Sequence, residues 1–254
     1  MAKRPILKNN YAGRLENIKM RPFFHRGELY TCLMHDMLAD PAIYPDHLYL
    51  LLQMVHSVEN PEHQRFCRFA ILDTLLSKTP PALDQSRFMA QALAHKPEDR
   101  VRSFLWIYAT SHSPMDLARA RLSAKLLVAN NQWELAAIAF VHIGSITFDP
   151  ADYIVARSQA QKIPSSQAQT TILSDLAVVS CALEDFLIVM SASEHTRDET
   201  IILHLMNFLE KRRLLGLAAE LTIQLPPSQV RTKQHLLELC QRLRAAKRQP
   251  PSCL

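Results

Sequence analysis

The fold is decided by residues 96–115, which read KPEDRVRSFLWIYATSHSPM. Apolar side chains recur there at intervals of three and four residues: Val101, Phe104, Leu105 and Tyr108. This spacing places them on one face of an α-helix. The helix is expected to begin at Pro97, because proline is tolerated where its missing N–H would have had no partner. A second proline, Pro114, opens the next apolar segment, so the stretch predicts successive helices over 97–111 and 114–130.

A polar residue followed by proline recurs along the chain. The side chain of Asp, Asn, Ser or Thr can accept a hydrogen bond from a backbone N–H of the first helical turn. The pairs are Asp40-Pro41, Asn60-Pro61, Thr79-Pro80, Ser113-Pro114 and Asp149-Pro150. Each pair precedes a segment with apolar residues at helical spacing, and each therefore predicts a helix start.

These starts and the apolar spacing predict most of the chain as helix. The expected helices lie at about 27–39, 45–58, 61–78, 82–95, 97–111, 114–130, 132–145, 150–162, 165–181, 184–193, 197–213, 215–224 and 228–247. Residues 145–148 form a tetrad with strand-like composition, between two of these helices. The chain has four glycines, and glycine is the residue that tight β-turns need. The expected fold class is all-α, with no substantial β-sheet.

The predicted helices are short and are joined by a few residues each. Short connections make sequential helices pack as antiparallel neighbours. The expected architecture is an irregular stack of about twelve antiparallel helices, an α-solenoid-like helical repeat. We expect a basic and aromatic N-terminal arm at 1–26, a single helical-repeat domain at 27–247 and a flexible tail at 248–254. If the domain divides into sub-bundles, the polar segment 159–171 is the expected boundary.

Residues within 114–145 carry a weak family resemblance. Trp133 is followed three positions later by Ala136 and a further four positions later by Phe140. This order of aromatic, alanine and aromatic residues resembles the second helix of a tetratricopeptide repeat. Leu215 and Ala218 repeat part of the pattern. The resemblance implies a stack of helix pairs, in agreement with the predicted helices.

Composition and charge narrow the class of protein. The net charge is +5 and the isoelectric point is near 9.0. Cations on the solvent-exposed faces of the helices explain this mild positive charge. The five cysteines are scattered and lack C-x-x-C spacing, so we expect free thiols in the cytoplasm or another reducing intracellular compartment. No apolar run approaches the ~20 residues of a membrane span. No secretory signal follows the charged N-terminus.

The sequence carries no recognisable reaction centre. It lacks the G-x-S-x-G, G-x-G-x-x-G and phosphate-loop patterns, and its histidines never take the H-E-x-x-H spacing of a zinc helix. The carboxylates do not cluster as general acid–base catalysis would require. We therefore expect no enzyme activity, no catalytic residue, no metal and no cofactor.

The expected function is that of a protein-binding adaptor or scaffold, as a subunit of a larger assembly. Each helix pair in a stack leaves one face uncovered, and such faces bind partners. Arginine and tryptophan are enriched at binding hot spots. The candidate partner-binding residues on two successive helices are Arg100, Arg102, Trp106, Arg119, Arg121 and Lys125.

Two other classes of function remain open at the level of sequence. A nucleic-acid-binding helical protein could use the N-terminal arm, where basic and aromatic residues alternate and could hold phosphates and stack on bases. The cations of that arm are Lys3, Arg4, Lys8, Arg14, Lys19, Arg21 and Arg26. The last helix also ends with cations: Arg242, Arg244, Lys247 and Arg248. The other class is a helical enzyme whose site is assembled from distant residues.

Overall fold

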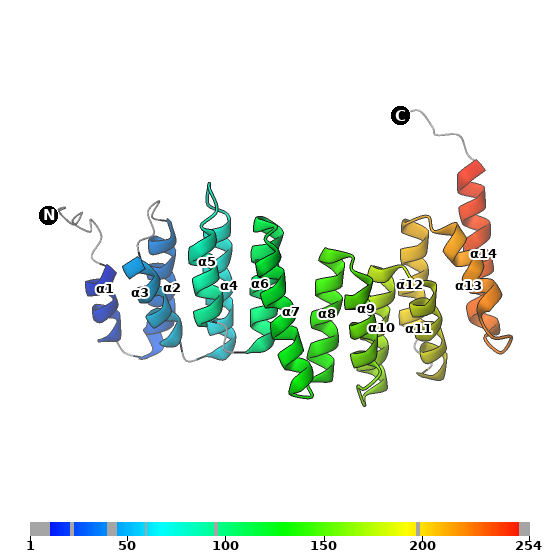
Figure 1. Cartoon of the computed structure of the whole chain (residues 1–254), viewed down its shortest axis with the longest axis horizontal. Helices are drawn as coiled ribbons and strands as arrows, with labels where there is room; N and C mark the ends of the chain where they lie inside the picture. Colours follow the sequence, from blue (N-terminus) through cyan, green and yellow to red (C-terminus); the bar gives the residue numbers. More distant parts are fainter. Residues whose placement is uncertain are drawn as a thin grey trace. The chain divides into compact units, whose positions relative to one another are not determined.

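The computed structural model of the chain describes residues 11–20, 23–39, 45–58, 60–93, 96–196 and 199–248. Within these ranges all regular structure is α-helical, as predicted, and it comprises fourteen helices (Figure 1). The number exceeds the expected one, partly because Tyr11–Lys19 form a helix in the segment that we expected to be an arm. Among the described helices, none combines the length and the apolar character needed to cross a membrane.

The helices follow one another with short connections. The first six are α1 (Tyr11–Lys19), α2 (Phe23–Ala39), α3 (Pro45–His56), α4 (Pro61–Leu76), α5 (Leu83–Leu93) and α6 (Pro97–Ser111). The next four are α7 (Pro114–Ala129), α8 (Trp133–Thr147), α9 (Pro150–Ala160) and α10 (Ser166–Ser180). The last four are α11 (Leu183–Thr196), α12 (Glu199–Lys211), α13 (Leu215–Gln224) and α14 (Val230–Arg248).

The chain divides into two compact units, residues 1–123 and residues 124–254, and the division falls inside α7. The segment 159–171, where we expected a boundary, lies inside the second unit. Its turn is tightly packed, because Ala160 and Ile163 are both buried.

The first unit is a two-layered stack of helices. From α1 to α6 each helix packs on the next along the chain. In addition, α1, α3 and α5 contact one another in sequence, as do α2, α4 and α6. A continuous core of apolar side chains runs from α1 to α5 and includes Leu15, Leu33, Leu51, Ile71 and Met89. Burying this core against neighbouring helices is what stabilises the short helices, since isolated helices of this length are marginal in water.

The second unit repeats this arrangement. Here α8, α10, α12 and α14 contact one another in sequence, and α11 contacts α13. Alanines are fully buried on the first three helices of this unit: Ala136, Ala137, Ala156, Ala160 and Ala177. Small side chains let helix backbones approach closely. Ala136, the alanine of the tetratricopeptide-like pattern, is one of these buried residues, so a larger side chain there would have to be accommodated within the packed core.

Helix starts follow the local chemistry at several of the predicted positions. Asn60 Oδ1 accepts hydrogen bonds from the backbone N–H groups of Glu62 at 2.9 Å and His63 at 3.2 Å. Asp149 Oδ1 accepts from Ala151 N at 3.0 Å. These two starts are confirmed. Thr79-Pro80 does not cap a helix, but α5 begins at Leu83, one residue from the expected start at 82. The pair Asp40-Pro41 lies outside the described residues.

The tetrad with strand-like composition is helical. Ser145, Ile146 and Thr147 belong to the last turn of α8, and Phe148 ends the helix in the left-handed conformation, with φ 55°. Composition alone misled here because β-branched residues are tolerated in a helix whose packing is already fixed by its neighbours.

Three turns between helices share one polar arrangement, which begins with a hydroxyl at the end of a helix. Ser111, Thr147 and Ser180 occupy this position, at intervals of about 35 residues, as in helical repeats. The hydroxyl of Ser111 accepts a hydrogen bond from Ser113 N at 3.1 Å and donates one to Asp116 at 2.8 Å. The intervening residue, His112, is left-handed, with φ 52°.

The other two turns have matching geometry. The hydroxyl of Thr147 donates to Asp152 at 3.0 Å, and that of Ser180 donates to Asp185 at 2.6 Å. In all three turns the acceptor is an aspartate five residues further on, in the first turn of the next helix, and it is buried. The negative charge of each aspartate is also stabilised by the positive N-terminal end of that helix.

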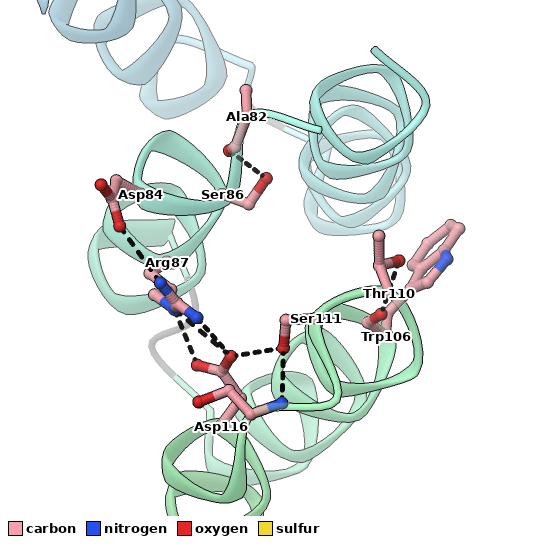
Figure 2. A network of polar contacts seen from close by, with 9 residues as sticks. Ala82, Asp84, Ser86, Arg87, Trp106, Thr110, Ser111 and Asp116 are labelled. Atoms are coloured by element: carbon pink, nitrogen blue, oxygen red, sulfur yellow. Dashed lines mark hydrogen bonds and ion pairs between the residues drawn. The ribbon is translucent and has the colours of Figure 1, made fainter. Parts of the chain in front are cut away.

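Arginines from earlier helices complete two of these turns. Arg87 on α5 donates to Asp116 through Nε at 2.9 Å and through Nη2 at 2.8 Å. Figure 2 shows this carboxylate between Arg87 and Ser111. In the second unit Arg157 on α9 donates to Asp185 at 2.6 Å. The Arg87–Asp116 pair therefore links α5 to α7, and the Arg157–Asp185 pair links α9 to α11.

A pair of glycine substitutions tests the packing of α8 on α9. A Cβ added at Gly144 would lie 2.6 Å from Tyr153 Cδ1, and the Tyr153 hydroxyl donates to the Gly144 carbonyl at 2.9 Å. We expect Gly144→Ala to lower the free energy of unfolding by about 1–2 kcal/mol, because overpacking outweighs the better helix propensity of alanine. Urea denaturation followed by circular dichroism measures the change.

The matched control is Gly216→Ala on α13. Nothing lies within 4 Å of a Cβ added at Gly216, so alanine there should raise the free energy of unfolding by about 0.5–1 kcal/mol. Equal effects at Gly144 and Gly216 would contradict the close approach of Tyr153 to α8.

Candidate interaction surface

Three aromatic side chains on neighbouring helices of the first unit form a surface that we call the aromatic patch: Phe66, Phe69 and Trp106. Phe66 and Phe69 lie three residues apart on α4, a spacing that places them on the same side of a helix. Phe69 contacts Trp106 on α6, with ring centroids 6.4 Å apart and ring planes inclined by 36°. Phe66 is 69% exposed and Trp106 is 39% exposed.

Buried polar contacts hold α4 against α6, the two helices that carry the aromatic patch. Asp99 in the first turn of α6 is buried, and two arginines of α4 reach it. Arg65 Nε lies 3.1 Å from one carboxylate oxygen, and Arg68 Nη1 lies 3.6 Å from the other. A small cavity of about 10 Å³ adjoins this contact and is lined by Phe69, among others. The volume is at most that of one water molecule, so the site is not a small-molecule pocket.

An arginine and a threonine on α6 lie close to Trp106 in the helix. Arg102 is exposed on α6, four residues before Trp106, and therefore lies on the same side of the helix. The Thr110 hydroxyl donates to the Trp106 carbonyl at 3.3 Å. Figure 2 shows the Trp106 ring pointing away from the Arg87–Asp116 pair. The ring is therefore available to a partner without disturbing the contact that stabilises the turn.

The other four candidate residues differ in their surroundings. The Arg119 guanidinium lies over the ring of buried Phe104, 5.5 Å from its centroid. Arg100 and Arg121 are half-exposed and are not free of partners. Lys125 is exposed and belongs to the second unit. Of the six predicted residues, Arg102 and Trp106 therefore share one exposed face with the aromatic patch.

Sequence reasoning missed Phe66 and Phe69. Both lie in a helix that was predicted, but no residue of that helix was singled out. A signal was present in the pattern, because the buried side of α4 is formed by Cys67, Ile71 and Leu75. Phe66 falls outside this stripe, and a large aromatic residue outside the buried stripe of a helix marks a candidate contact surface.

The basic N-terminal segment is partly folded onto the first unit. Tyr11 and Leu15 of α1 are buried. Its two described cations both face carboxylates: Arg14 lies 2.6 Å from Asp36, and Lys19 lies 2.7 Å from Glu16. The side chains of the other five cations lie outside the described part of the chain: Lys3, Arg4, Lys8, Arg21 and Arg26. The described cations of this segment are therefore partnered by the protein itself.

The described cysteines differ in burial, because Cys67 and Cys240 are buried whereas Cys32 and Cys181 are exposed. Cys32, Cys67, Cys181 and Cys240 are free thiols. Burial raises the pKa of the Cys67 thiol above its ordinary value, against a smaller opposite effect of a backbone hydrogen bond, so this thiol stays protonated and unreactive at neutral pH. Within the described ranges, no three His, Cys, Asp or Glu side chains lie close enough to hold a metal ion.

No family model, no curated protein and no solved structure matches this chain.

Proposed function

We propose that this protein is a non-catalytic adaptor or scaffold that binds another protein through the aromatic patch. The observation that carries the proposal is the exposure of Phe66 and Trp106 on neighbouring helices, where Trp106 contacts Phe69, three residues from Phe66 on α4. A single exposed apolar residue is ordinary, whereas adjacent exposed aromatic rings are typical of contact surfaces.

The energetics favour a macromolecular partner. Aromatic side chains bury large areas, and removing their exposed area from water is favourable by roughly 25 cal/mol per Å². Trp is also among the residues that dominate binding hot spots, and a nearby arginine such as Arg102 supplies a polar edge. The free thiols of the described cysteines support a reducing intracellular compartment, such as the cytoplasm, as the place where the adaptor works.

The test uses the full chain as bait and a patch variant as its control. Wild-type protein and the variant Phe66→Ser/Trp106→Ser are each immobilised and exposed to native lysate, and retained proteins are quantified. We expect at least one protein to be retained by the wild type and to fall about tenfold or more with the patch variant. The matched control is Phe148→Ser, which changes a side chain that is 72% exposed in the second unit.

Affinity measurements on the captured partner complete the test. In calorimetric titrations we expect Trp106→Ala to raise the dissociation constant by about 30-fold. Capture that does not depend on the patch, or that is lost equally with Phe148→Ser, would contradict the proposal. So would turnover of a small molecule by the purified chain.

The nucleic-acid alternative has its own measurement, which is the salt dependence of binding to random oligonucleotides. The variant should lack residues 1–10 and keep α1, because removing α1 would uncover the core around Leu15. Binding that weakens steeply with salt and disappears with this deletion would favour nucleic acid over a protein partner.

A further inference from the structure

A hollow in the second unit lies where α12, α13 and α14 meet. Its volume is about 440 Å³, and its described lining residues are Glu210, Arg213, Leu215, Arg242, Leu243 and Ala246. The three helices pack on one another, so the hollow is part of the folded unit. Its size suits one or two side chains of a ligand, and its lining combines apolar and cationic groups.

One of the two arginines in this pocket is already paired. Arg242 donates to Glu210 through Nε at 2.9 Å and through Nη2 at 3.2 Å. This bidentate arrangement is the one that guanidinium and carboxylate groups favour. It fixes Arg242 at the wall of the pocket and neutralises its charge.

The second arginine, Arg213, is exposed and forms no ion pair with any residue that the structure describes. It lies two residues after Lys211, the last helical residue of α12, and adopts the left-handed conformation, with φ 54°. The next N–H, of Leu214, donates to the Leu209 carbonyl at 2.9 Å. Glycine is the residue that this backbone position favours. The turn itself therefore gives no reason for an arginine there.

The charge around the pocket is positive. Lys211, Arg212 and Arg213 follow one another and are all exposed, whereas Glu210 is the acidic residue among the described lining. Lys211 and Arg212 can be explained as cations at the C-terminal end of α12. Arg213 has an additional property, because it borders a hollow with an apolar floor of Leu215 and Leu243.

We propose that this pocket binds an acidic peptide segment of a partner protein, with a carboxylate held by Arg213 and a neighbouring apolar side chain against Leu215 and Leu243. The carboxylate of the peptide would bind the Arg213 guanidinium in the same way as the Glu210 carboxylate binds Arg242. The apolar floor favours a peptide over a polynucleotide, whose phosphates would use the arginine but leave the floor uncovered. The pocket lies in the second unit, so this proposal does not depend on the aromatic patch.

The test measures fluorescence anisotropy of a labelled peptide with blocked ends, Leu-Glu-Asp-Leu-Glu-Leu, titrated with the full chain. A second peptide, with Gln and Asn in place of Glu and Asp, reports the need for carboxylates. The key variant is Arg213→Gly, because glycine fits the left-handed backbone and removes the guanidinium without straining the turn. The matched control is Arg212→Gly, which removes the adjacent charge outside the lining.

We expect saturable binding of the acidic peptide, at least about tenfold tighter than that of the amide peptide. Arg213→Gly should weaken it about tenfold, and Arg212→Gly less than about twofold, while the thermal unfolding of Arg213→Gly stays at or above that of the wild type. Three results would overturn the proposal. They are no saturable binding, an equal loss with both variants, or displacement by a single-stranded decanucleotide at lower concentration than by unlabelled peptide.

Discussion

Replacing Arg87 with methionine is expected to lower the free energy of unfolding by about 3 kcal/mol. The reason is that Asp116 is fully buried and accepts four hydrogen bonds, three of them from Arg87 at 2.8, 2.9 and 3.3 Å and one from Ser111 at 2.8 Å. Methionine keeps the apolar stem but removes the guanidinium, and a buried carboxylate without its partner is costly.

The pH dependence of the same variant supplies a second readout. Burial alone would raise the pKa of Asp116, but hydrogen bonds from Arg87 and Ser111 and the charge of Arg87 lower it below the ordinary value. A carboxyl with a depressed folded-state pKa contributes stability above its unfolded pKa, about 3.9, and loses it as the pH falls through the folded-state value. The difference between wild type and Arg87→Met should therefore be complete at pH 7 and shrink below about pH 4.

Arg102→Met is the matched control, because Arg102 is exposed and should change the free energy of unfolding by less than about 0.5 kcal/mol. Urea denaturation of the wild type, Arg87→Met, Asp116→Asn and Arg87→Met/Asp116→Asn closes a double-mutant cycle. The double variant should lose less than the sum of the single changes. Additive losses would mean that Arg87 and Asp116 do not interact in solution.

Replacing Phe186 with alanine is expected to lower the free energy of unfolding by about 4 kcal/mol. Phe186 on α11 is fully buried, and its ring stacks on Phe208 of α12 with centroids 6.3 Å apart. Alanine leaves a cavity and removes this contact between successive helices of the second unit. Thermal unfolding followed by circular dichroism at 222 nm should show the loss.

Phe148→Ala is the control for this substitution, because the same change at a side chain that is 72% exposed creates no cavity. Phe186→Leu should lie between the two variants, at about 1 kcal/mol, since leucine fills most of the volume. A loss below about 1 kcal/mol for Phe186→Ala would contradict the packing of α11 on α12.

Local chemistry explains why the helices could be predicted from sequence. The starts of α4 and α9 depend on Asn60 and Asp149, whose side chains bond backbone groups two or three residues away. No capping side chain of this kind marks the start of α5. There the N–H of Ala82 donates to Leu75 of the preceding helix, and the helix begins only at Leu83.

Contacts between distant residues explain what the sequence could not provide. The position of Phe66 outside the apolar stripe of α4 was visible in the sequence, whereas the packing of Phe69 on Trp106 of α6 was not, because it depends on which helices become neighbours. Arg87 and Asp116 are 29 residues apart and meet because α5 lies beside the start of α7. The hydroxyl-to-aspartate spacing of five residues was visible in the sequence, and it is the pattern from which the recurring turns could have been found.

Five described residues adopt positive φ, and none of them is glycine: His112, Asn131, Phe148, Cys181 and Arg213. Each ends or follows a helix, and each side chain is exposed. Glycine would satisfy the backbone at such corners but would present nothing to a partner. The rim of each unit can therefore acquire new recognition chemistry by single substitutions at its corners, without lengthening a loop or disturbing the register of the helices.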